Sequence, residues 1–414
     1  MHDIKHIKDN KTAIQIGLNN KNDKSDIDKV LELDELRKKT LFEFETLRAE
    51  QNKISKQIGQ LKKEKQDASF LLEDMHSVAE KIKDLQAKTT EIENELHQLL
   101  LSIPNIPHSS VPIGKTEHDN VVIKTYGDID TSFTPIEHQD FVVENGFLDF
   151  TRGAKITGSG FPVFVDKGAM LERALINFML DFHIKNHGYV EVKVPFVVNR
   201  QSMIGTGQLP KLENDMYHLL KEDYFLIPTS EVPVTNLFAG EILHNDQLPI
   251  KYVSYSPCFR REAGSYGKET KGLQRLHQFN KVEMVRFVKP EDSWNVLEEM
   301  LNNAEAILQA LKLPYRVITL CTGDMSFASA KTYDIEVWSP ATKKFLEVSS
   351  VTNFEDFQAR RANIRFRDSD GKVKFVHTLN GSGLATPRTF IAIIENYQQK
   401  DGSFVVPDVL QKYM

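Results

Sequence analysis

The sequence predicts an α+β protein in which a helical coiled-coil arm precedes a domain built on an antiparallel sheet flanked by helices. Apolar residues recur at steps of seven, four and three through much of residues 30–100, which is typical of two long helices packed along each other. Alternating apolar and polar residues predict two pairs of strands, 252–260 with 277–287 and 333–338 with 345–350. Each pair should close as an antiparallel hairpin.

Composition places the chain among ordinary water-soluble proteins. Its 414 residues suffice for two or three domains, and 40% are hydrophobic and 27% charged. The formal net charge of -6 indicates that any nucleic-acid contact is local. Cys258 and Cys321 lie far apart, so there is neither a disulfide framework nor the spacing of a zinc site. No stretch resembles a signal peptide or a membrane span, and we expect a cytoplasmic protein without membrane partners.

The arm is expected to follow a polar segment, residues 1–29, that begins with a short helix. Two helical segments come next, separated at residues 64–69, and no proline occurs between Val30 and Ile103. With about 34 residues in each helix, an antiparallel pair would extend about 50 Å. The apolar repeat consists of Leu47, Ile54, Ile58 and Leu61 in the first segment and Leu72, Met75, Val78, Ile82, Leu85, Ile92, Leu96 and Leu99 in the second.

The outer half of this predicted arm is basic. In this half, six cations outnumber two acids, Glu50 and Glu64. One interpretation is a solvated coiled-coil surface, and the other is a surface for a nucleic-acid backbone, where release of counterions would drive binding. The cations are Arg48, Lys53, Lys56, Lys62, Lys63 and Lys65.

A linker, a helix and a strand are expected after the arm. Residues 102–114 contain three prolines, which prevent the second arm helix from continuing. Residues 171–187 have helical spacing and precede Gly188, a residue type that commonly ends helices. Valines then alternate with charged residues over 190–194, as in a strand, before Pro195.

The hairpin at 252–287 is the most informative stretch. Strand ends hold side chains in fixed positions, so its root should present a group of site residues: Arg260, Glu262, Phe279 and Glu283. The connection between the strands contains glycines, which interrupt regular structure, and cations, which suggest an anionic ligand. These residues are Gly264, Gly267 and Gly272 and Lys268, Lys271 and Arg275.

Other segments carry glycine or polar residues at predicted boundaries. Residues 203–212 are predicted to be a loop, and Thr229 is predicted to cap a helix containing Glu231. Residues 379–384 are expected to form a tight glycine turn that leads, past Arg388, into an apolar helix whose start would favour an anion. Taken alone, Glu347 near a strand end would simply be solvated.

These motifs together resemble one family. Phe259-Arg260-x-Glu262, the connection, and His277-x-Phe279-x-x-x-Glu283 resemble motif 2 of class II aminoacyl-tRNA synthetases. The fuller runs at 261–267 and 272–283 resemble the seryl-tRNA synthetases in particular. The helix and strand at 171–194 are similar to motif 1, Gly-Thr-Gly-Gln-Leu-Pro at 205–210 to a loop of the seryl enzymes, and 379–388 to motif 3.

The resemblance implies a class II catalytic domain and an enzyme that attaches L-serine to tRNA(Ser) through seryl adenylate. It implies a tRNA-binding domain at 1–103, with its helical hairpin at about 30–100, a linker at 104–114 and a catalytic domain at 115–414. The implied partners are tRNA(Ser), L-serine, ATP and a second copy of the chain, but not DNA. Selenocysteine tRNA is a further candidate substrate. The arm cations would contact the long variable arm of the tRNA.

The resemblance also assigns residues to the substrates. Those expected to bind L-serine are Thr229, Ser230, Glu231, Arg260, Glu283, Asn380 and Ser382. Those expected to bind ATP are Arg260, Arg261, Glu262, Arg275, Phe279, Glu347, Val348, Ser349, Ser350 and Arg388. Glu347 and Ser350 would hold Mg²⁺ with ATP, and Arg260 and Arg388 would be catalytic. No zinc is expected, because the pocket residues include no Cys/His cluster.

The chain departs from the family pattern at a few positions. Leu212, Arg261 and Val351 replace residues more usual there, and Thr386-Pro387 replaces Val-Gly before Arg388. Proline is compatible with a first helical turn. Three other interpretations compete with this one. A non-catalytic synthetase-like RNA-binding protein should lack the motif arginines or pocket acids, and a carrier-protein aminoacylating relative should lack the arm. A structural coiled coil would leave the last three quarters of the chain unexplained.

Overall fold

The computed structural model describes residues 1–130, 132–262 and 272–414, which divide into two compact units. One unit comprises residues 2–19 and 23–104, and the other comprises Met1, residues 20–22 and 105–414. The functional domain boundaries stay a prediction. Four residues of the basic connection, Gly264, Gly267, Lys268 and Lys271, lie outside the described residues.

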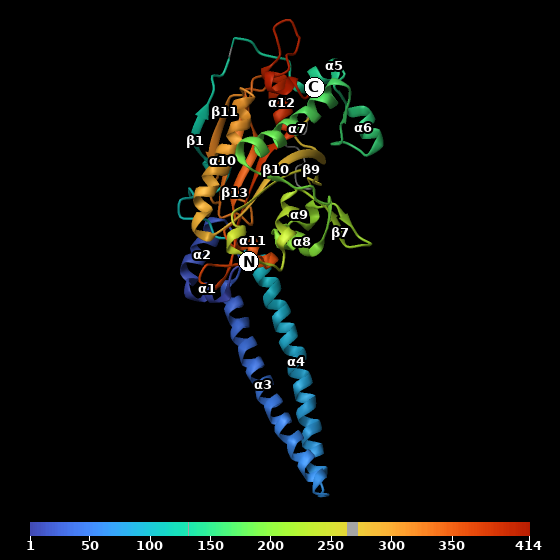
Figure 1. Cartoon of the computed structure of the whole chain (residues 1–414), viewed down its shortest axis with the longest axis vertical. Coiled ribbons are helices and arrows are strands. Elements are labelled where there is room, and N and C mark those ends of the chain that lie inside the picture. Colours follow the sequence, from blue (N-terminus) through green and yellow to red (C-terminus); the bar gives the residue numbers. More distant parts are fainter. Residues whose placement is uncertain (131, 263–271) are drawn as a thin grey trace. The chain divides into compact units, whose positions relative to one another are not determined.

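The first unit is helical, and its long helices confirm the predicted arm. After α1 (Ile4–Asp9) and α2 (Lys11–Asn20), helices α3 (Ile27–Lys63) and α4 (Ser69–Ser102) run antiparallel along each other (Figure 1). The side chain of Asp26 accepts a hydrogen bond from the backbone N–H of Lys29 and thereby caps the start of α3.

The seam between α3 and α4 is apolar, with one difference from the predicted repeat. Ile54 and Ile58 pack against Val78 and Ile82, and all four are buried. Leu72 is exposed, whereas its neighbour Leu71 packs on this cluster. Residues 71, 75, 78 and 82 follow steps of four, three and four, which keep their side chains on one helical stripe, and residue 72 falls outside it.

The second unit is built on a large sheet. Among the described residues, its strand order is β1–β11–β12–β13–β16–β10–β9–β4, and every pair except β9–β4 is antiparallel. The two predicted hairpins are present as β9–β10 and β12–β13. The strands are β1 (Val121–Tyr126), β4 (Val190–Glu191), β9 (Ile250–Phe259), β10 (Gln278–Val288), β11 (Tyr315–Thr319), β12 (Lys331–Ser339), β13 (Lys344–Asn353) and β16 (His377–Ala385).

In the described part of the chain, the longer helices of this unit pack on the sheet and contribute to its main apolar core (Figure 1): α7 (Lys167–His187), α10 (Ser293–Ala310) and α12 (Thr386–Asn396). As predicted, α7 ends at Gly188, which has a left-handed φ of 69°. Along β10, Val282 and Met284 belong to this core. Because successive side chains of a strand point to opposite faces, Lys281 and Glu283 face away from α7, α10 and α12.

Residues 379–384 form part of strand β16 rather than the predicted tight turn. Their glycines lie where neighbouring side chains come close to the backbone. A Cβ atom at Gly383 would lie 2.5 Å from Nε2 of His183 on α7, and one at Gly381 would lie 3.2 Å from the side chain of Val351. Glycine in this strand therefore permits close packing and does not mark a chain reversal.

Short elements complete the unit. The smaller sheets pair β2 (Leu148–Asp149) with β3 (Val163–Phe164), β7 (Tyr224–Leu226) with β5 (Val197–Asn199) and β6 (His218–Leu219), and β14 (Arg365–Arg367) with β8 (Ile242–His244) and β15 (Val373–Phe375). The short helices are α5 (His138–Glu144), α6 (Phe150–Ile156), α8 (Arg200–Gly205), α9 (Glu231–Thr235), α11 (Phe357–Ala362) and α13 (Asp408–Gln411). Residues 203–205 thus belong to a helix, not to the predicted loop; the Asn199 side chain caps it. In the described ranges, no helix is long and apolar enough to span a membrane.

Candidate active site

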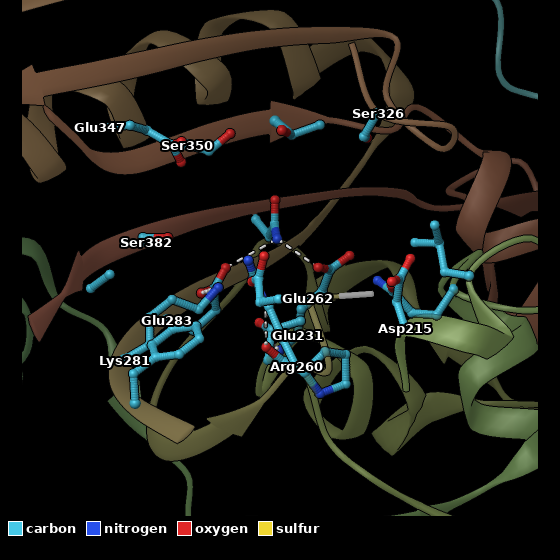
Figure 2. Close-up of a pocket in the computed structure, with 18 of the residues that line it drawn as sticks. Asp215, Glu231, Arg260, Glu262, Lys281, Glu283, Ser326, Glu347, Ser350 and Ser382 are labelled. Carbon is cyan, nitrogen blue, oxygen red and sulfur yellow. Dashed lines mark hydrogen bonds and ion pairs between the residues drawn. The ribbon is translucent and has the colours of Figure 1, made fainter. Parts of the chain in front are cut away.

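A cavity of about 740 Å³ is lined in part by strand side chains that face away from α7, α10 and α12, among them Lys281 and Glu283. Strand β10 contributes Phe279, Lys281 and Glu283, and β16 contributes Asn380 and Ser382. Figure 2 labels Lys281, Glu283 and Ser382 among them. Residues two apart on a strand share a face, so the regular alternation of these strands brings the five side chains to one wall. Most of the residues that the sequence assigned to serine and ATP lie here.

Strand β13 presents Glu347 and Ser350 to the same cavity, although they lie three positions apart. A regular strand would point them to opposite faces. The pairing register of β12 and β13 shifts at this point. Ile335 pairs with Ser349, whereas the next residue of β12, Glu336, pairs with Glu347. This bulge adds one residue to β13 and returns Ser350 to the face of Glu347.

Two carboxylates meet at one amide in the cavity. The side-chain N–H groups of Asn380 donate to Glu231 Oε2 at 2.9 Å and to Glu283 Oε1 at 3.0 Å (Figure 2). Lys281 Nζ lies 2.5 Å from the other oxygen of Glu283. Burial, together with the nearby charge of Glu283, raises the pKa of Glu231 to about 7. This arrangement favours a small cation, which would relieve the repulsion between the two acids.

The segment before Glu231 differs from the predicted capping box. Ser230, not Thr229, is the N-cap residue of α9. The Thr229 hydroxyl does accept a hydrogen bond from the backbone N–H of Glu231, at 3.1 Å. The Glu231 carboxylate instead accepts from Gln358 and Asn380, so it faces the cavity rather than the backbone of Thr229.

Three arginines reach the cavity, and neighbouring groups hold each of them. Arg260 Nε donates to the carbonyl of Pro228 at 3.4 Å, and its guanidinium lies 5.2 Å from the ring centroid of Phe279. The other two form ion pairs, Arg275 with Glu262 at 2.8 Å and Arg388 with Glu347 at 3.3 Å. Arg388 stands in the first turn of α12, directly after the proline. A cavity with three arginines suits a polyanion.

Oxygen ligands at β13 fit Mg²⁺, which favours one or two carboxylates plus phosphate oxygens and water. Glu347 and Ser350 supply oxygens, and Asp334 pairs with Ser350 across β12 and β13. Asp334 Oδ1 is buried without a hydrogen-bond partner in the described part of the chain, and burial beside Glu347 raises the pKa of Asp334 well above its ordinary range. Within those residues, no three His, Cys, Asp or Glu side chains form a metal cluster, so phosphate oxygens would have to complete the shell.

The structure does not place every assigned side chain in the cavity. Ser230 and Ser349 are buried elsewhere, and the Ser349 hydroxyl donates to the carbonyl of Ser382 at 2.6 Å. The bulge in β13 directs the Ser349 side chain away from the cavity. Arg261 is exposed and outside the lining. The sequence interpretation missed Lys281, which the alternation of β10 with Phe279 and Glu283 could have revealed.

Comparisons with known proteins agree on one family. The model of the seryl-tRNA synthetase N-terminal domain matches residues 1–107, and that of the tRNA synthetase class II core domain (G, H, P, S and T) matches residues 214–397. Serine–tRNA ligases of Caldicellulosiruptor bescii and Geobacter sulfurreducens are 55% and 52% identical, over 100% of this chain and 99% and 98% of theirs.

Solved structures are similar over the whole chain. Seryl-tRNA synthetase from Pyrococcus horikoshii, complexed with ATP, has a TM-score of 0.92 and 39% identity and covers 100% of this chain and 98% of its own. Cytoplasmic serine–tRNA ligase from Naegleria fowleri, in complex with AMP, has a TM-score of 0.87 and 30% identity, with 100% and 97% covered. The chain therefore belongs to the seryl-tRNA synthetase family of class II aminoacyl-tRNA synthetases.

Proposed function

We propose that the protein is a serine–tRNA ligase that activates L-serine with ATP in this cavity and then transfers it to tRNA(Ser). The observation that carries the proposal is a single cavity in which a buried acid pair, Glu231 and Glu283, lies beside three arginines. An amino acid offers an ammonium group for the acids, and its carboxylate and the triphosphate offer anions for the arginines.

Serine selection would depend on the acid pair and its amide partner. The serine ammonium group would bind between Glu231 and Glu283, and the serine hydroxyl would pair with Glu283, Asn380 or Ser382. If glycine or alanine bound instead, these buried polar groups would have no hydrogen-bond partner. That loss costs far more binding free energy than the absence of one methyl group from an apolar pocket. The same geometry therefore supports both affinity and selectivity.

Activation would need positioning and charge stabilisation rather than a general base, because a carboxylate is already a nucleophile at neutral pH. A serine carboxylate oxygen attacks the α-phosphorus of ATP, and the bond to pyrophosphate breaks. Arg260 would stabilise charge at the α-phosphate, while Arg275 and Arg388 would hold the β- and γ-phosphates. Phe279 would stack on adenine. Glu347 and Ser350 would hold Mg²⁺, which neutralises phosphate charge when bound.

Transfer of serine to the tRNA would take place in the same cavity. A hydroxyl of the terminal adenosine of the tRNA attacks the carbonyl carbon of seryl adenylate, and the bond to AMP breaks. The departing phosphate oxygen accepts the hydroxyl proton, so no further side chain is required. Exposed cations on the arm, whose side chains face solvent along α3 and the turn after it, would bind the tRNA backbone.

The function is tested by ATP–pyrophosphate exchange with each of the twenty amino acids in turn. Serine should support exchange strongly, and alanine, glycine and threonine should support it weakly. Exchange driven best by another amino acid, or none at all in the presence of Mg²⁺, would contradict the proposal.

The protein should also be a homodimer. Helix α7 and strand β4 correspond to the segments that resemble motif 1, and Val190 at the sheet edge is 59% exposed, an apolar side chain left on the surface. A twofold interface would cover such residues. Sedimentation equilibrium at micromolar concentration should give twice the chain mass of 47.3 kDa, and a stable monomer would remove this proposal.

Serine binding should weaken in acid. The pKa of Glu231 is about 7, so its carboxyl is increasingly protonated as the pH falls below 7 and no longer attracts the serine ammonium group. The charged groups around it are Glu283, Lys281 and Arg260. The KM for serine should rise about tenfold between pH 8 and pH 6, since each pH unit below a pKa costs a factor of ten.

The KM for ATP provides the internal control for this pH effect and should change little. Substituting Glu231→Gln should raise the KM for serine and remove most of its pH dependence in this range. A serine KM that stays constant from pH 8 to pH 6 in the unmodified protein would show that Glu231 does not bind the ammonium group.

A further inference from the structure

We infer that Gln358 is a positioning residue, which holds the Glu231 carboxylate in the orientation that receives the serine ammonium group. The inference rests on the proposed function and deepens it. Gln358 lies on α11, does not line the cavity and belongs to none of the motifs that carry the family resemblance. It acts through Glu231 and not on the substrate.

The orientation of the Gln358 amide is determined by its partners. Its Nε2 donates to Glu231 Oε1 at 2.6 Å and to the backbone carbonyl of Thr206 at 3.2 Å. Its Oε1 accepts from the Thr378 hydroxyl at 2.7 Å. Glu231, when ionised, and the carbonyl offer only acceptors, so the NH₂ group must point toward them. The residue is 0% exposed, so bulk solvent does not compete for these bonds.

Both oxygens of Glu231 are thereby held. Gln358 donates to Oε1 and Asn380 donates to Oε2, so each oxygen of the carboxylate accepts a hydrogen bond from a different amide. Asn380 also touches Glu283, which ties the orientation of one acid to that of the other. Donation from Gln358 favours the ionised form of Glu231 and offsets part of the effect of burial.

Helix α11 also contacts a second segment of the cavity lining. Arg361, three residues after Gln358 and therefore on the same helical face, donates to the carbonyl of Ile204 and to that of Leu209, each at 2.8 Å. Between these carbonyls lie Thr206, Gly207 and Gln208, which line the cavity. One short helix thus holds both the serine-binding acid and the segment beside it.

The substitution Gln358→Glu tests the inference, because it keeps the shape but replaces the donor with a second carboxylate. We expect the KM for serine in ATP–pyrophosphate exchange to rise at least about tenfold, since a charge-assisted hydrogen bond is removed and repulsion is added. The KM for ATP should change less than about twofold, because the ATP-binding arginines keep their partners.

The matched control is Gln309→Glu, the same change on α10, where the amide donates to the Tyr315 hydroxyl outside the cavity. It should leave both KM values unchanged. Gln358→Met removes the donor without adding charge. It should raise the KM for serine by a smaller factor and move its pH dependence to higher pH, because Glu231, facing Glu283, Lys281 and Arg260, loses a bond that favours ionisation.

Equal changes in the two KM values, or an unchanged KM for serine in Gln358→Glu, would overturn the inference. If that variant does not fold, Thr378→Val, which releases the Gln358 carbonyl, should still raise the KM for serine about threefold, and no change would overturn it. Failure of the proposed function would be distinguishable, because the unmodified protein would then lack serine-dependent exchange.

Discussion

Replacing Arg260 with Ala is expected to slow serine-dependent adenylate formation by about a hundredfold or more while the protein stays folded. A donor aimed in advance at the charge that develops in a transition state is typically worth about 3–4 kcal/mol. The backbone N–H of Arg260 donates to the carbonyl of His277 at 2.9 Å, and that bond does not need the side chain. The substitution should therefore affect the reaction and not the hairpin.

Single-turnover formation of seryl adenylate measures this effect directly, and circular dichroism checks the fold. Arg367→Ala makes the same change at an exposed position of β14, outside the cavity, and should react at the normal rate. A folded Arg260→Ala variant that also reacts near the normal rate would show that Arg260 does not contact the α-phosphate.

Deleting residues 47–85, with a short loop joining α3 to α4, should separate the two steps of the reaction. Among the described residues, those that line the cavity all lie between Thr206 and Arg388, so serine-dependent exchange should stay near normal. Charging of tRNA should fall by about two orders of magnitude, because the deletion removes six cations that would bind phosphates. Equal charging by the shortened and intact proteins would make the arm purely structural.

Point substitutions provide a milder version of the deletion. Changing the six arm cations to Gln keeps the helices, whose apolar seam is formed by other residues. Binding to tRNA should weaken, and the slope of log affinity against log salt should decrease by about one for each phosphate that the arm no longer neutralises. The exchange rate serves as the control and should not change.

The sequence by itself determined the elements that depend on local pattern. The spacing of Ile54, Ile58, Val78 and Ile82 predicted the arm, because a helical stripe has a period that is visible in one segment. Alternation predicted the β9–β10 and β12–β13 hairpins for the same reason. Residues at the root of the first hairpin could be assigned to one site, since a strand end holds them at a known spacing.

Only the tertiary structure decided what depends on contacts between distant segments. Glycines at 381 and 383 suggested a turn, but they accommodate Val351 and His183, which approach from other elements. The raised pKa of Glu231 likewise depends on burial. The hydrogen bond that orients its carboxylate comes from Gln358, which lies 127 residues away in the chain. No periodicity within one segment predicts a contact between distant residues. The free energy of such a contact comes from desolvation and hydrogen bonding, which exist only after the sheet and its helices have packed.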